Sequence, residues 1–189
     1  LVLDVVYDRR DKYGAKSTYG PIGDRPPRTL NIQLAEPVDY NTNELTLAAE
    51  HQGGGYQVRA EYQYSDFANQ IDAMQWQNVY TNGQPGATYD AWDRSVSVFG
   101  VRPLSPDNRY HNVTGMFGAN LPKDSRFTAT AAYGMLEQNQ SLLPYSYNND
   151  QLAMQTLPRS SAGAAIDTLN FVADYTITPV PKVNLRAYF

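Results

Sequence analysis

The sequence contains no cysteine among its 189 residues. This absence excludes disulfide bonds, thiolate metal sites, a catalytic cysteine and covalent attachment of haem c through a Cys-x-x-Cys-His motif. Long apolar runs are also lacking, because no run approaches the roughly 18 residues of a membrane-spanning helix. A membrane β-barrel remains possible, since only every second residue of a spanning strand is apolar.

Positive charge is scarce as well. Lys and Arg total 15 against 19 Asp and Glu, which gives a formal net charge of −4. Nucleic-acid-binding proteins carry a basic surplus, so we expect no nucleic-acid partner. The sequence also lacks a nucleophile elbow, a phosphate-binding glycine loop before a helix and a His-Glu-x-x-His motif. We therefore expect a protein that is not an enzyme.

The main positive signal is the alternation of apolar and polar residues with a period of two, which is typical of strands. Tyr56, Val58, Ala60, Tyr62 and Tyr64 share one face of such a segment, and polar residues occupy the other. We expect strands near residues 1–8, 43–51, 56–67, 110–121, 126–138, 167–178 and 183–189. The apolar faces carry no charge in mid-strand; Asp66, Glu137 and Asp167 lie at strand ends.

The expected connections alternate between short and long. Residues 52–55, 122–125 and 179–182 are tight turns rich in Gly or Pro. Residues 9–42, 68–109 and 139–166 are long polar stretches that we expect to be loops, with Ser95–Val101 as a strand extension or hairpin inside the second. The pattern predicts an all-β, antiparallel up-and-down meander with two unlike ends.

Strand length favours a membrane barrel. About twelve residues at roughly 3.3 Å each span about 40 Å, or about 30 Å of height at a tilt of about 40°. Soluble strands average only about five or six residues. The chain begins and ends inside strand-like patterns, so we expect a piece of a longer polypeptide. A soluble, carbohydrate-binding β-sandwich is one alternative, since its core faces are also apolar.

Several short motifs resemble a known family. They occupy residues 37–45, 62–69, 76–78, 104–108, 120–123, 135–139, 143–145, 157–161 and 166–168. In this order and spacing they resemble the MtrB/PioB family, the outer-membrane barrels of porin–cytochrome electron conduits. The terminal Phe189 is similar to the closing residue of outer-membrane barrels, but the family register places this strand in mid-barrel.

The resemblance implies a fold, a location and a set of partners. It implies a transmembrane β-barrel segment of about seven or eight strands in a larger barrel, with short periplasmic turns and long extracellular loops. It implies a place in the bacterial outer membrane, where the barrel sheathes a periplasmic multihaem (decahaem) c-type cytochrome for extracellular electron transfer. An outer-surface multihaem cytochrome is a further expected partner. A barrel of about eight strands is filled by its own side chains, so this chain alone cannot enclose a cytochrome.

Two sets of residues are candidates for contact with the surroundings. The partner-facing lumen candidates are Glu44, Glu50, Arg59, Glu61, Arg126, Asp174 and Arg186. Their alternative role is to hydrate the lumen or to form cross-strand ion pairs. The interfacial aromatic girdle candidates are Tyr56, Tyr64, Phe67, Phe127, Tyr133 and Tyr175, although strict alternation puts Phe67 on the polar face. These aromatics, with Trp76 and Trp92, would alternatively stack on sugars.

We expect no cofactor bound by this chain, because the haem groups belong to the partner. His51 and His111 are the only histidines, and both fall on the apolar side of strand ends. Acidic and amide side chains at 107–108 and 148–150 could bind Ca²⁺ in a loop, with turn capping as the commoner explanation. A general diffusion or saccharide porin is the alternative function to the cytochrome sheath.

Overall fold

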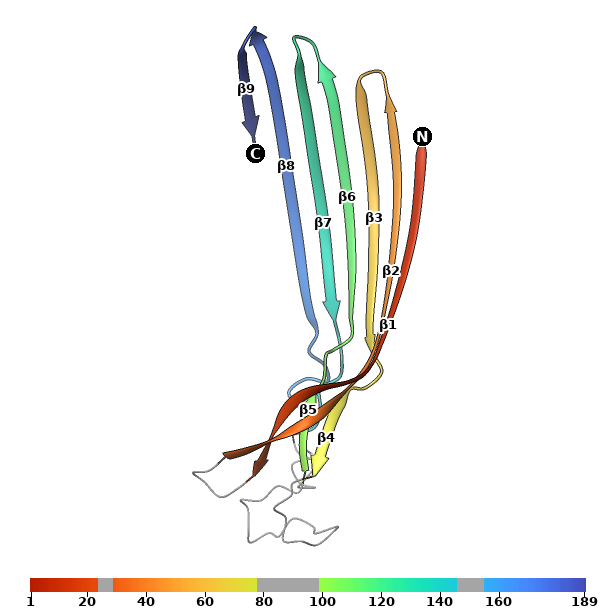
Figure 1. The fold of residues 1–189 in the computed structure, drawn as a ribbon, viewed down its shortest axis with the longest axis vertical. Helices are drawn as coiled ribbons and strands as arrows, with labels where there is room; N and C mark the ends of the chain where they lie inside the picture. The colour runs from red at the N-terminus through yellow and green to blue at the C-terminus, as the bar shows by residue number, and fades with distance from the viewer. Residues whose placement is uncertain (24–28, 78–98, 146–154) are drawn as a thin grey trace.

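The computed structural model describes residues 1–23, 29–77, 99–145 and 155–189 (Figure 1). Seven strands form one antiparallel sheet in the order β1-β2-β3-β6-β7-β8-β9, and β4 pairs with β5 in a second sheet. The strands are β1 (Val2–Gly23), β2 (Thr29–Gly53), β3 (Tyr56–Asn69), β4 (Ala73–Gln77), β5 (Phe99–Pro103), β6 (Asn108–Leu121), β7 (Ser125–Gln138), β8 (Ala164–Val180) and β9 (Val183–Tyr188). The predicted all-β meander is confirmed.

In the ranges given above, no helix is long and apolar enough to cross a membrane.

Tight turns close one end of the large sheet, which we call the turn end. Gly54 and Gly55 join β2 to β3 with φ of 56° and 87°, the positive values that both central residues of a type I′ hairpin turn require. Lys123 and Asp124 between β6 and β7, and Lys182 between β8 and β9, also have positive φ. The long connections lie at the opposite end, the loop end (Figure 1). The two unlike ends follow the prediction.

The first predicted loop is wrong, because β1 and β2 continue through most of it. Their ladder pairs every residue from Val2 with Glu50 to Gly23 with Thr29. The sequence gives a signal that the first interpretation missed: Ile32, Leu34 and Val38 alternate with polar or small residues. The expected strands at 1–8 and 43–51 are therefore the near parts of one long hairpin, which runs past the rest of the sheet.

The other boundaries differ less from the prediction. The stretch 68–109 contains the β4–β5 hairpin, which includes the end of the expected Ser95–Val101 strand; residues 95–98 and Trp92 lie outside the described residues. The stretch 139–166 includes the start of β8 and a single bridge between Ser141 and Ser161. Residues 148–150, a predicted calcium-binding candidate, are also outside the described residues.

Apart from the far part of the β1–β2 hairpin, the large sheet has no second layer over either face in the part of the chain that the structure describes. Leu169, Val113 and Phe171 are 80%, 55% and 51% exposed. A soluble β-sandwich requires a facing sheet that buries such residues. The small buried cluster of Met74, Trp76 and Leu104 lies at the loop end, where β4 and β5 pack against Ile32 and Leu34 of the long hairpin.

Candidate functional site: the two faces of the sheet

Strand register divides the large sheet into two faces. Residues directly opposite each other on antiparallel strands point to the same face, so a row can be followed from strand to strand. One row contains Leu3, Ala49, Ala60, Gly115, Ala131 and Phe171, and the next contains Val5, Leu47, Tyr62, Val113, Tyr133 and Leu169. We call the face with these rows the apolar face, and the opposite face the polar face.

The two faces differ in exposure over β2 and β3. On the apolar face Leu47 and Val58 are exposed. On the polar face the side chains of Arg59 and Glu61 are 28% and 32% exposed. Charged side chains therefore lie in the more sheltered face and apolar side chains in the open one. This arrangement is the reverse of a water-soluble domain, whose large apolar side chains are buried.

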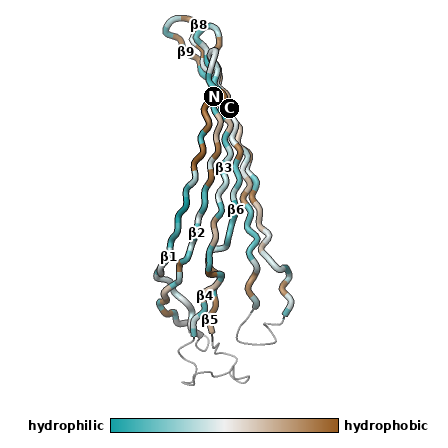
Figure 2. Tube along the Cα trace, turned by 90° about the vertical axis from the view of Figure 1, so that its right-hand side faces the viewer, coloured by the Kyte–Doolittle hydropathy of each residue, from teal (hydrophilic) through white to brown (hydrophobic). Residues whose placement is uncertain are grey.

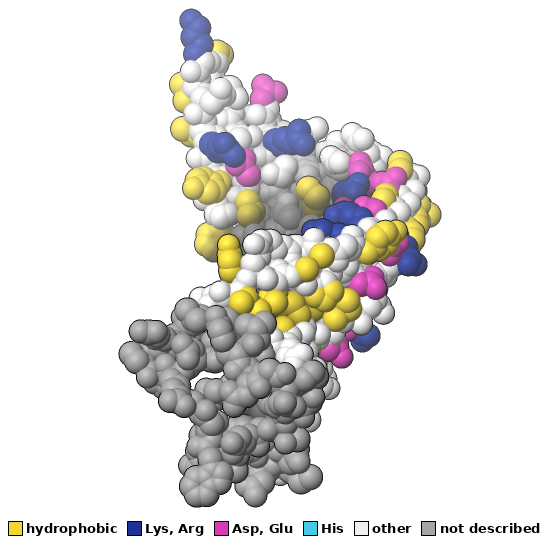
Figure 3. All heavy atoms as spheres, turned by 60° about the horizontal axis from the view of Figure 1, so that its bottom comes forward, with side chains coloured by type: hydrophobic (Ala, Val, Ile, Leu, Met, Phe, Trp, Pro, Cys, Tyr) yellow, Lys and Arg dark blue, Asp and Glu magenta, His cyan; other side chains and the backbone are white. Residues whose placement is uncertain are grey.

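The space-filling view agrees with this distribution. In Figure 3, which brings the loop end forward, Lys, Arg, Asp and Glu side chains gather within the arc of the sheet, and hydrophobic side chains line much of its outer edge. Figure 2 shows the change along β1, whose backbone is coloured hydrophobic near the N-terminus and hydrophilic farther down. The apolar face therefore ends before the strands reach the loop end.

Aromatic residues mark both limits of the apolar face. Tyr56, Phe127 and Tyr175 lie in one row at the turn end, joined through Ala119 of β6. Toward the loop end, Tyr64 lies in the row just beyond that of Tyr133. The sequence could not show that the first three residues share a row, since that depends on the register of four strands.

A polar row closes the apolar face at the loop end. It contains Arg9, Asn43, Asp66, Arg109 and Glu137 in direct register. Arg109 Nε donates to Asp66 Oδ1 at 3.2 Å. From Tyr56 to Asp66 there are ten residue steps along β3, about 33 Å at roughly 3.3 Å each. At a tilt of about 40° this is about 25 Å of height, the usual height of the apolar band of an outer-membrane barrel.

Just beyond this row, hydrogen bonds join the first two strands. Arg9 and Asn41 donate to the Asp11 carboxylate, and these bonds hold the pKa of Asp11 below its ordinary value. Tyr133 likewise donates to Asp167 Oδ1 at 2.8 Å on β8. These acidic residues, at the loop-end limit of the apolar face, thus have partners on that same face.

On the polar face, the structure brings two lumen candidates, Glu50 and Glu61, together around a third, the cationic Arg59. Arg59 donates to Glu61 at 2.7 Å and to Glu50 at 3.4 Å, and Asp4 lies 3.7 Å from the same guanidinium. Gln57 donates to the second carboxylate oxygen of Glu50. The register explains the cluster, because Glu50 is directly opposite Arg59.

Glu44 lies in a second cluster, nearer the loop end. Arg10 donates to Glu44 and to Asp8, both at 2.9 Å. Sequence reasoning missed Asp4, Asp8 and Arg10, although they alternate with Leu3, Val5 and Tyr7. From Asp4 to Arg10 and across to β3, the polar face carries five carboxylates (Asp4, Asp8, Glu44, Glu50, Glu61) and two guanidiniums (Arg10, Arg59), hence a net charge of −3.

The remaining lumen candidates lie at the turn end of the polar face. Arg186 of β9 donates to Asp174 of β8. Arg126 is in the same row as Arg186, with Thr176 between them. These three residues are far along the strands from the Arg10 cluster, so the seven candidates form separate groups rather than a single site.

The middle of the polar face over β6–β8 has uncharged side chains, most of them small. Thr114, Ala132 and Asn170 form one row, and Met116, Thr130 and Val172 form the next. Gly134 is buried there beneath Tyr110, whose hydroxyl would lie 2.9 Å from a Cβ at that position. The polar face is therefore charged over β1–β3 and neutral at the centre of β6–β8.

Phe67 is not on the face that a girdle requires. Its register partners place it on the polar face, where its ring lies 5.3 Å from that of Tyr40. The alternation that gives Tyr64 to the apolar face gives Phe67 to the opposite one. Its place in the girdle set is corrected for this reason.

The two histidines lie on the apolar face, as expected. His111 Nδ1 and the Tyr62 hydroxyl are 2.8 Å apart, and the ring of Tyr64 is 5.0 Å from that of His111. His51 lies beside Tyr56 at the turn end. Both imidazoles thus pack against tyrosines at the limits of the apolar face.

The calcium candidate at 107–108 serves the backbone. Asp107 Oδ1 accepts a hydrogen bond from the Asn69 backbone amide at 2.7 Å. In the described ranges, no group of three or more His, Asp or Glu residues is placed to hold a metal ion. Asp107 therefore links the end of β3 to the start of β6.

An antiparallel sheet with an apolar outer band of bilayer height, polar limits and a charged opposite face is a wall section of an outer-membrane β-barrel. The family model of the outer membrane beta-barrel porins MtrB/PioB matches residues 2–189, and the chain belongs to this family. The expected family and the expected location in the bacterial outer membrane are thus confirmed.

A curated relative agrees with this assignment. The chain is 25% identical over 143 residues to the outer membrane protein MtrB of Shewanella baltica (strain OS185). The match covers 76% of this chain and 18% of the relative. The chain therefore spans about a fifth of the length of the relative that it matches.

Proposed function

We propose that this chain is one section of a larger barrel that sheathes and positions a periplasmic multihaem c-type cytochrome for electron transfer across the outer membrane. The observation that carries the proposal is the open polar face. Met116 and Val172 lie on it and are still 45% and 47% exposed, so the sheet's own side chains do not fill the space before them. In small barrels of about eight strands, by contrast, the barrel's own side chains fill the interior. A wider barrel leaves room for a protein.

The open edges of the sheet support the same proposal. β1 and β9 are at opposite ends of the strand order and are not paired with each other. A barrel in lipid must close, since unpaired backbone groups are costly there. Further strands from the same polypeptide would complete the wall.

The proposed role is positional and not catalytic. The apolar face holds the wall in lipid, and the polar face keeps lipid away from the enclosed cytochrome and orients it. Electrons pass between haem groups carried by the partner. The turn end faces the periplasm and the loop end faces the cell surface, where an outer-surface multihaem cytochrome would dock.

Affinity purification tests the proposal. The full-length polypeptide that contains this chain, tagged and extracted from native outer membranes in mild detergent, should retain a protein that stains for covalent haem. An unrelated outer-membrane porin, tagged and treated in parallel, is the control. A pure barrel without haem stain from cells that express the cytochrome would contradict the sheath.

The open polar face also suits a diffusion porin for ions or saccharides. Conductance in planar bilayers separates the two functions. A sheath should conduct little while its cytochrome is inside and more once the cytochrome gene is deleted. Equal, high conductance in both preparations would favour the porin.

A further inference from the structure

The β4–β5 hairpin lies on the polar side of the long β1–β2 hairpin. Thr18 and Gly20 share a face with Arg10, and Leu34 and Glu36 share a face with Glu44, because alternate residues of a strand point to the same side. Arg102 of β5 donates to the Thr18 hydroxyl at 2.8 Å. β4–β5 therefore packs on the continuation of the polar face and not on the outside of the wall.

An ion cluster around one buried carboxylate fixes this contact. The Glu36 side chain is 4% exposed and pairs with Lys16 at 2.8 Å and with Arg102 of β5. A buried carboxylate is stable only while its cationic partners stay in place, and removing one partner is strongly destabilising. The cluster thus ties β5 to both strands of the long hairpin.

Trp76 fixes the other strand of the small hairpin. Its indole N–H donates to the Pro21 carbonyl oxygen at 3.1 Å. Its ring lies so close to Gly20 and Gly100 that a Cβ at either position would overlap it. Glycine is needed at both positions because the ring occupies the space of a side chain.

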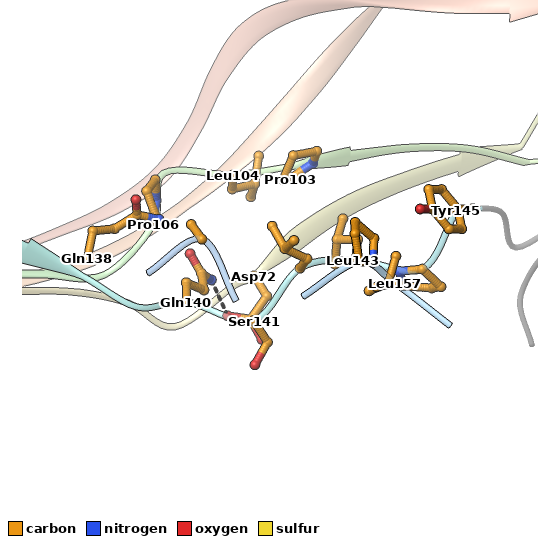
Figure 4. Close-up of a pocket in the computed structure, with 14 residues that line it drawn as sticks. Asp72, Pro103, Leu104, Pro106, Gln138, Gln140, Ser141, Leu143, Tyr145 and Leu157 are labelled. Carbon is orange, nitrogen blue, oxygen red and sulfur yellow. Dashed lines mark hydrogen bonds between the residues drawn. The ribbon is translucent and has the colours of Figure 1, made fainter. Parts of the chain in front are cut away.

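A third attachment joins the base of β4–β5 to the segment after β7. Gln140 donates to Asp72 Oδ1 at 2.7 Å (Figure 4). Asp72 in turn belongs to the base of the small hairpin, because its carbonyl oxygen accepts from the Leu104 amide. An apolar pocket of about 540 Å³ lies between the two segments, with Leu104, Pro106 and Leu143 in its lining. The small hairpin is thus held from the β1–β2 side and from the β7 side of the sheet.

From these attachments we infer that β4–β5 is a fixed stop that narrows the mouth of the barrel at the loop end and meets the end of the enclosed cytochrome. The inference rests on the proposed sheath function. Met74, Trp76 and Arg102 face the long hairpin, so Gln75 and Val101 point away from the wall. The side of β4–β5 that faces away from the wall is uncharged over Ala73–Gln77 and Phe99–Pro103. Arg102, the one charged residue of these two ranges, faces the long hairpin. The uncharged side suits an uncharged polar surface on the partner.

A stop at this place would set the depth of the cytochrome along the barrel axis. The charged polar face can orient the cytochrome about the barrel axis, but a wall of side-by-side antiparallel strands offers little resistance to sliding along them. A hairpin anchored across that path resists sliding by contact. The last haem of the partner would then lie at a constant distance from the cell surface.

Photo-crosslinking from single positions tests the stop. A benzoylphenylalanine is placed in the full-length protein at Gln75, at Gln33, or at Thr114. Gln75 is on the exposed side of β4, Gln33 is exposed on the outer face of the same long hairpin, and Thr114 is on the polar face of the wall. Crosslinks to the cytochrome are expected from positions 75 and 114 and not from 33.

The pattern of crosslinks separates the two proposals. A crosslink from position 114 without one from position 75 overturns the stop and leaves the sheath standing. Equal crosslinking from positions 75 and 33 also overturns the stop. Crosslinking from none of the three contradicts the sheath, and the stop with it.

Conductance of the cytochrome-free barrel gives an independent measurement. The double variant Trp76→Ala, Arg102→Ala removes two attachments of the small hairpin and should raise the single-channel conductance. Tyr19→Ala, at an exposed position of the same long hairpin, is the matched control and should leave the conductance unchanged. An unaltered conductance in the double variant overturns the stop.

Discussion

Arg59 illustrates how single residues depend on the register of the sheet. Its guanidinium lies among Glu50, Glu61 and Asp4, which come from three strands. Without the cation, three carboxylates would repel one another on a half-sheltered face. Arg186 is paired only with Asp174 among the contacts described, and its side chain is 70% exposed. The two arginines therefore differ in how much the fold depends on them.

Replacing Arg59 with methionine should lower the stability of the full-length barrel. The expected result is a lower urea midpoint in detergent micelles, because the acidic cluster loses its shared cation. Arg186→Met should change the midpoint less, since an exposed ion pair contributes little. Equal shifts for the two variants would contradict the cluster as a stabilising unit.

Phe171 and Val172 provide a test of the two faces at adjacent positions. Phe171 lies on the apolar face and Val172 on the polar face, and their exposed fractions are similar. Phe171→Arg should destabilise the membrane-inserted barrel by about 2–4 kcal/mol, the cost of Arg near the bilayer midplane. Val172→Arg should cost much less, because its side chain faces water or the partner. Refolding equilibria in lipid vesicles measure both, and equal costs would exclude lipid on the Phe171 side.

At the scale of elements, β6 carries the limits of the membrane band along a single strand. Arg109 lies in the polar row, His111 among tyrosines, and Val113, Gly115 and Phe117 in the apolar rows. The residues between them face the other side. The side chains of this one strand thus lie in the headgroup region, in the hydrocarbon layer and on the lumen side.

Cysteine scanning along β6 can measure these environments in the full-length barrel, because these 189 residues contribute no cysteine and any elsewhere are first replaced by serine. In cytochrome-free membranes, a water-soluble maleimide should label Thr114→Cys and Met116→Cys and spare Val113→Cys and Phe117→Cys. Arg109→Cys should react, as a residue outside the hydrocarbon. Labelling without period two along the strand would contradict the assigned faces.

The elements that the sequence predicted well are those with one face in lipid. For β3, β6 and β7 the face toward lipid carries no Asp, Glu, Lys or Arg in mid-strand, because side chains in contact with lipid must be apolar. The far parts of β1 and β2 read as loop because they lie beyond the band, where the face that continues the apolar one carries Asp11 and Asp39. They form strands because β1 and β2 pair with each other and pack against Trp76. The indole of Trp76 donates to the Pro21 carbonyl oxygen across a separation of 55 residues, which no local pattern reveals.

The candidate site could be predicted only in part for a similar reason. The face of Glu50, Arg59 and Glu61 follows from alternation within each strand. The contact of Arg59 with Asp4 requires the pairing of β1 with β2 and of β2 with β3. The opposite placement of Phe67 follows from alternation, but its contact with Tyr40 depends on the same register.

At the scale of the whole molecule, the sheet ends in two open edges. β1 and β9 each pair on one side only in the described strand order, and an unpaired edge in lipid carries unsatisfied backbone groups. The sheet contains seven strands, and β4–β5 covers only the far part of β1–β2 in the described ranges. Its stability in a membrane therefore depends on neighbouring strands.

The 189-residue chain on its own should not form a stable, monomeric barrel. Refolded into detergent micelles, it is expected to associate through its edges, since exposed long edges pair readily with other chains. Size-exclusion chromatography with light scattering and heat-dependent gel mobility provide the measurement. A heat-modifiable monomer would show that the strands close without additional ones.

The uneven charge of the polar face has a consequence for rotation inside the bore. One sector is electronegative, with a surplus of three carboxylates beside β1–β3, while the sector before β6–β8 is neutral at its centre. A roughly cylindrical protein with one positively charged side would favour a single rotational orientation about the barrel axis, with that side toward β1–β3. If the barrel sheathes a cytochrome as proposed, the cytochrome would then have the same orientation about the barrel axis in every copy.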